Sequence, residues 1–153
     1  MRNTTGSLDF FTWQLRSWSA RFYEEGNRFH YLRPLYGCLF IMTDDELDNF
    51  YINSDDGRAW LLRQMKTQFG LYGAESRARV VDALEYVLAS GSWLAHWRGI
   101  VPHAIPLDDV TDKEKYVRDL FQALAGRAPD PTFDVRAIEL VDDIGPDGIN
   151  VRK

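Results

Sequence analysis

Acidic residues gather around aromatic residues in one stretch of the chain, between Ile41 and Gly57. The stretch reads MTDDELDNFYINSDD and contains six acidic residues but no Lys or Arg. Clustered carboxylates steer a basic partner toward a surface, and aromatic anchors supply much of the affinity of a protein interface. We therefore predict a partner-binding surface formed by Asp44, Asp45, Glu46, Asp48, Tyr51, Asp55 and Asp56.

The same carboxylates are poor candidates for catalysis or for calcium binding. Asp44 and Asp48 would share one helix face, as acid–base catalysis could use, but acids at helix starts are already explained by the helix dipole. Aligning Gly57 with the invariant glycine of an EF-hand loop places Arg63 where the loop requires a bidentate Glu. We therefore assign no catalytic residue, metal ligand or cofactor to this chain.

Other reactive residue types form no recognisable motif. Cys38 lies in the apolar run LYGCLF, where burial would keep its thiol inert, and neither a P-loop nor a G-x-S-x-G elbow is present. A Gly and a Pro separate His96 from His103, which excludes the helical histidine pair of a zinc site. An enzyme remains the alternative, with a pocket assembled from His96, His103, Asp108 and Asp109.

Size and composition favour one globular domain in the cytoplasm. A chain of 153 residues fits a single domain, predicted here to span residues 1–153. The net charge of −5 disfavours direct nucleic-acid binding, which needs a basic face. No secretory signal and no apolar run of about 18 residues is present, so we expect neither export nor a membrane span. The single cysteine agrees with a reducing compartment, and the excess of Arg over Lys with a bacterial source.

The elements that position the acidic stretch are predicted to be helices. Thr43 and Glu46 form a capping box for a helix over 44–51, and Ser54 caps another that ends at Gly70. Further helices are expected over 74–89 and from Thr111 to Gly126. An earlier helix over 8–26 has an apolar stripe, whereas residues 36–41 could form a strand or a short helix.

The C-terminal residues 127–153 differ from the rest of the chain. The segment VRAIELV, followed by the turn residues GPDG, predicts a β-hairpin, with a mobile tail as the alternative. The expected fold is therefore mainly α: a single-domain bundle of about five helices with a short C-terminal β-hairpin or extended tail.

These features favour a small acidic cytoplasmic protein that binds another protein with a basic surface. The most concrete form is an immunity protein or antitoxin-like inhibitor that neutralises a basic partner such as a nuclease toxin. Besides the enzyme, a second alternative is an oligomeric structural helical protein that packs through the first helix. The sequence leaves the oligomeric state open.

Overall fold

The computed structural model describes residues 31–137, and this part of the chain is helical without a strand. The predicted helix over 8–26 lies outside the described residues, as does the predicted C-terminal hairpin apart from its first residues, Val135–Ala137, which form a 3-10 turn. The mainly α class is confirmed for the described part. Its elements, in chain order, are η1 (Arg33–Tyr36), α2 (Gly37–Phe40), α3 (Asp44–Asp48), α4 (Asp55–Phe69), α5 (Ala74–Ser90), α6 (Trp97–Ile100), α7 (Lys113–Ala125) and η2 (Val135–Ala137).

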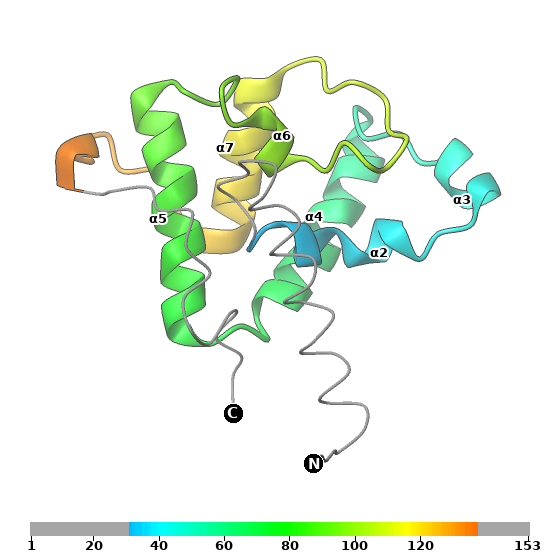
Figure 1. The fold of residues 1–153 in the computed structure, drawn as a ribbon, viewed down its shortest axis with the longest axis horizontal. Helices are drawn as coiled ribbons and strands as arrows, with labels where there is room; N and C mark the ends of the chain where they lie inside the picture. The colour runs from blue at the N-terminus through cyan, green and yellow to red at the C-terminus, as the bar shows by residue number, and fades with distance from the viewer. Residues whose placement is uncertain (1–30, 138–153) are drawn as a thin grey trace, which may run out of the picture.

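Helix α7 occupies the centre of the fold, with α5 on one side and α4 on the other (Figure 1). Its buried residues are Tyr116, Val117, Leu120, Phe121 and Leu124. Four of them form adjacent pairs, as expected for a helix that packs against neighbours on two sides. Helix α3 lies at the far edge of the molecule from α5 (Figure 1). Within residues 31–137, no helix is long and apolar enough to cross a membrane.

Two tyrosines link the segment before α2 to the central helix. The hydroxyl of Tyr36 donates a hydrogen bond of 2.7 Å to the carbonyl oxygen of Ile100 and lies 2.8 Å from the hydroxyl of Tyr116. Both rings are fully buried. Loss of solvation raises the pKa of both phenols, that of Tyr116 to about 12. The pair therefore stays neutral and joins η1, α6 and α7 through buried hydrogen bonds.

The helix predicted over 74–89 is observed as α5, and two of the three predicted N-caps are confirmed. Thr43 and Glu46 form the reciprocal capping box, with the Glu46 N–H donating to Thr43 Oγ1 at 3.2 Å and the Thr43 N–H donating to Glu46 Oε2 at 2.8 Å. Ser54 Oγ accepts the N–H of Gly57 at 3.0 Å and begins α4. The third start differs, because Asp112 rather than Thr111 caps α7.

The strand considered for residues 36–41 is wrong, and the short-helix alternative is confirmed. The chain forms a 3-10 turn from Arg33 to Tyr36 and continues directly into α2. The buried residues Leu32, Leu35, Tyr36 and Leu39 explain the outcome, since their spacing follows a helix rather than the alternation of a strand. The helix predicted over 44–51 is shorter than expected and ends at Asp48.

A buried carboxylate holds the chain that follows α7 against α5. Glu85 on α5 is 3% exposed, and its two oxygens accept from the guanidinium of Arg127 at 2.8 and 3.0 Å. The N–H of Asp130 donates to the same carboxylate at 2.7 Å. These hydrogen bonds, those from Arg127 foremost, lower the pKa of Glu85. We call the contact of Glu85 with Arg127 and Asp130 the latch.

Candidate protein-binding groove

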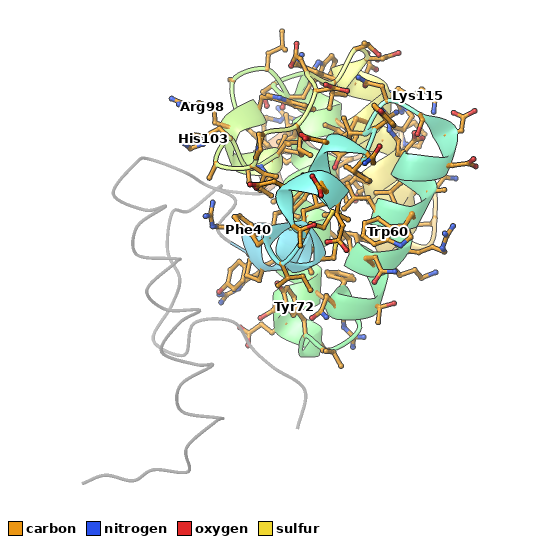
Figure 2. The ribbon with its side chains drawn as sticks, turned by 90° about the vertical axis from the view of Figure 1, so that its right-hand side faces the viewer. Phe40, Trp60, Tyr72, Arg98, His103 and Lys115 are labelled. Atoms are coloured by element: carbon orange, nitrogen blue, oxygen red, sulfur yellow. The ribbon has the colours of Figure 1, made fainter. Side chains whose placement is uncertain are left out.

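An open groove of about 890 Å³ lies between α4 and the segment that contains α2 and α3. Figure 2 views the molecule from this side, with Trp60 of α4 labelled. Apolar and acidic residues share the lining. Among the residues that the structure describes, the lining consists of Cys38, Ile41, Met42, Asp45, Glu46, Asn49, Phe50, Asp56, Gly57, Trp60 and Gln64. We call it the acid-rimmed groove.

One face of α4 forms the first side of the groove. Asp56, Trp60 and Gln64 recur at intervals of four residues, so their side chains lie in a row along the helix. Trp60 is half-buried, and its ring meets that of Phe50 edge to face, with the ring centroids 5.8 Å apart. This contact fixes the position of the indole at the groove surface.

The short helices α2 and α3 and the residues between them form the second side. Ile41 lies just after α2 and is 84% exposed, which is unusual for a large aliphatic side chain. Asp45, Glu46 and Asn49 extend the lining along α3, where the capping box fixes the start of the helix. Cys38 of α2 also lines this side, and burial raises the pKa of its thiol.

The charge of the groove is negative and unbalanced. In the described range 31–137, neither Lys, Arg nor His lines it. Within residues 31–137, none of the six carboxylates from Asp44 to Asp56 forms a salt bridge, although seven salt bridges occur elsewhere in that range. An open surface that combines apolar side chains with unpaired carboxylates is suited to a cationic, partly apolar ligand.

The structure divides the seven residues predicted to bind a partner. Three of them, Asp45, Glu46 and Asp56, line the groove together although α3 and α4 are separate helices. The other four lie on the exposed surface outside its lining: Asp44, Asp48, Tyr51 and Asp55. Helical geometry accounts for the division, because adjacent residues such as Asp55 and Asp56 point in directions about 100° apart.

Sequence reasoning missed the apolar part of the groove. The aromatic residues of the acidic stretch, Phe50 among them, were linked to the acids, but Ile41, Met42 and Trp60 were not. The spacing of Asp56, Trp60 and Gln64 is the signal that could have found one side. The opposite side has no such signal, because it requires knowing that α2 contacts α4 and that α3 borders the same groove.

Gly57 sets the shape of the groove where α4 begins. Ser54 donates two hydrogen bonds to the carbonyl oxygen of Tyr51, from its N–H at 3.1 Å and from its hydroxyl at 2.9 Å. These bonds tighten the turn before the helix. A side-chain carbon on Gly57 would collide with that carbonyl oxygen. Glycine is therefore required here by close approach of the backbone, and its φ is not in the left-handed region.

The four residues of the alternative enzyme site do not line this groove. His103 and Asp108 are exposed, and Figure 2 shows His103 beside Arg98, well separated from Trp60. Asp109 is paired with Lys113 at 3.2 Å, and His96 is half-buried. Among residues 31–137, no three His, Cys, Asp or Glu side chains are grouped so that they could hold a metal ion.

Comparison with known proteins does not assign the groove. Neither the protein-family models, nor the curated proteins, nor the solved structures contain a match to this chain.

Proposed function

We propose that this chain is a protein-binding protein whose acid-rimmed groove takes a basic, partly apolar segment of another protein. One observation carries the proposal. Asp45 and Glu46 from α3 and Asp56 from α4 border the same apolar surface, and none of the described residues that line the groove is cationic. A basic segment would supply the missing charge, while Ile41 and Trp60 would bury apolar surface against it.

The more specific form of the proposal is an inhibitor of the immunity-protein or antitoxin type, acting in the cytoplasm of a bacterium. Such a protein covers the basic active site of a nuclease, and acidic residues around an apolar centre provide the complementary potential. The net charge of −5 supports rapid association with a basic protein, because opposite net charges raise the encounter rate.

The test compares two pairs of substitutions that remove equal charge. The groove pair is Asp45→Asn with Asp56→Asn, and the control pair is Asp44→Asn with Asp55→Asn. Each pair removes one acid from α3 and one from the start of α4, but only the first pair alters the groove lining. Net charge and helix-dipole effects are therefore matched.

Each full-length protein is immobilised and exposed to an extract of its source cells, and the captured proteins are identified. We expect a basic protein that is retained by the wild type and by the control pair, is lost from the groove pair, and dissociates as salt rises. Capture that is the same for both pairs, or insensitive to salt, would contradict the proposal. For the inhibitor form, the captured protein has an enzymatic activity that one equivalent of this chain blocks.

A further inference from the structure

Trp60 lines the groove, and no cationic side chain of the described residues lies over its ring. Four aromatic rings within residues 31–137 have a cationic side chain over them. These pairs are Arg33 over Phe40, Arg58 over Tyr116, Lys113 over Trp97 and Arg127 over Phe121. Trp60 is not among them, although indole is the ring that binds a cation most strongly.

The surroundings of Trp60 match the requirements of one cation in particular. Asp56 lies one helical turn before it and Gln64 one turn after it, and all three line the groove. A guanidinium is planar, so it can stack on the indole while its edge donates to the Asp56 carboxylate and to the Gln64 amide oxygen. A lysine ammonium group is a compact charge with three N–H donors and has no planar face, so it cannot stack on the indole in this way.

We infer that Asp56, Trp60 and Gln64 form a seat for an arginine side chain of the partner. The inference rests on the proposed function and names the chemistry by which the groove selects its occupant. The apolar residues Ile41 and Met42 on the other side of the groove accept an apolar side chain of the same segment. The occupant is therefore an arginine-bearing amphipathic segment of a protein, and arginine is preferred over lysine.

The contact between Trp60 and Phe50 makes the seat rigid. Because the edge-to-face packing holds the indole in place, the ring needs no reorientation to receive a cation. The seat also has a matched residue for control, since Asp55 carries the same charge next to Asp56 but lies outside the groove lining.

The experiment titrates the full-length protein with three synthetic peptides that share one amphipathic sequence with leucine at its apolar positions. The polar positions carry arginine in the first peptide, lysine in the second and neutral citrulline in the third. Affinity is measured by calorimetry, and the indole N–H signals are followed by NMR, with that of Trp60 assigned from Trp60→Phe. Melting curves establish that each variant is folded.

We expect the arginine peptide to bind the wild type at least fivefold more tightly than the lysine peptide, and the citrulline peptide to bind weakest. The preference should vanish in Trp60→Leu and in Asp56→Asn, persist in Asp55→Asn, and be accompanied by a shift of the Trp60 indole signal.

Equal affinity for arginine and lysine in the wild type would overturn the arginine seat while leaving the proposed function standing. Binding that leaves the Trp60 signal unmoved would likewise overturn the seat. If none of the peptides binds, the seat is rejected, and the capture experiment decides the proposed function separately.

Discussion

Glu85 and the acids of the groove carry the same charge in opposite surroundings. Glu85 is buried and receives three hydrogen bonds, two of them from a guanidinium. Asp45 and Asp56 are exposed and have no cationic partner among the described residues. A buried carboxylate must be paired for the chain to fold, whereas an exposed one can stay unpaired at little cost. The latch uses its charge within the fold, and the groove leaves its charge available to a ligand.

The largest expected effect on stability in the groove comes from its glycine rather than from its acids. Gly57→Ala places a carbon against the carbonyl oxygen of Tyr51, which must open the turn before α4. We expect the free energy of unfolding to fall by about 3 kcal/mol, as for other overpacked sites, in a urea titration.

Gly37 provides the control for that substitution, because it has helical φ and open space around its missing side chain. Gly37→Ala should therefore stabilise the protein by roughly 0.4–1 kcal/mol. Equal effects of the two substitutions would show that helix propensity, and not the close approach of the backbone, governs position 57.

Neutralising the latch should affect folding more than neutralising the groove. Glu85→Gln replaces one acceptor oxygen with an NH₂ group that faces a donor, and we expect a loss of about 2 kcal/mol in the free energy of unfolding. Asp45→Asn, measured in the same urea titration, should change it by less than about 1 kcal/mol. A similar loss in both variants would remove the distinction between the two kinds of acid.

The pH dependence of stability gives a smaller and finer test of the same distinction. Because the folded state lowers the pKa of Glu85, the unfolded chain binds its proton more readily as the pH falls. The stability advantage of the wild type over Glu85→Gln should be constant near neutral pH. It should shrink as the pH drops below 4.5, the ordinary pKa of glutamate.

The groups facing Glu85 are Arg127, Asp130 and Asp82. Asp82 also titrates at acidic pH, so it contributes to the same pH dependence of stability. Burial and the charge of Glu85 raise the pKa of Asp82, so its own contribution changes in the opposite direction. Repeating the comparison in an Asp82→Asn background separates the two carboxylates. An advantage that stays constant to low pH would show that the hydrogen bonds do not favour the ionised form of Glu85.

Local signals in the sequence predicted the local features of the fold. The capping box at Thr43, the cap at Ser54 and the ends at Gly70 and Gly126 follow from side-chain and backbone chemistry within a few residues, and all four are observed. The N-cap of α7 is Asp112 rather than Thr111, because the backbone before α7 is bonded by the distant residue Asn53. Asn53 Oδ1 accepts the N–H of Thr111, and its Nδ2 donates to the carbonyl of Asp109.

The latch and the groove required knowledge of tertiary contacts. Glu85 and Arg127 are 42 residues apart, and their spacing has no periodic signature. The acids of the groove were visible as a cluster, but their division into lining and non-lining residues depends on how α3 faces α4. Sequence therefore indicated where charge accumulates and not which carboxylates share a surface.

The position of Cys38 makes the groove accessible to chemical footprinting without any substitution. It is the only cysteine of the chain, so a thiol reagent modifies a single site. Its raised pKa keeps the sulfur protonated at neutral pH, and labelling should therefore be slow and should accelerate in alkaline buffer. A ligand seated over Cys38 would retard labelling further, which turns the rate of alkylation into a direct measure of groove occupancy in solution.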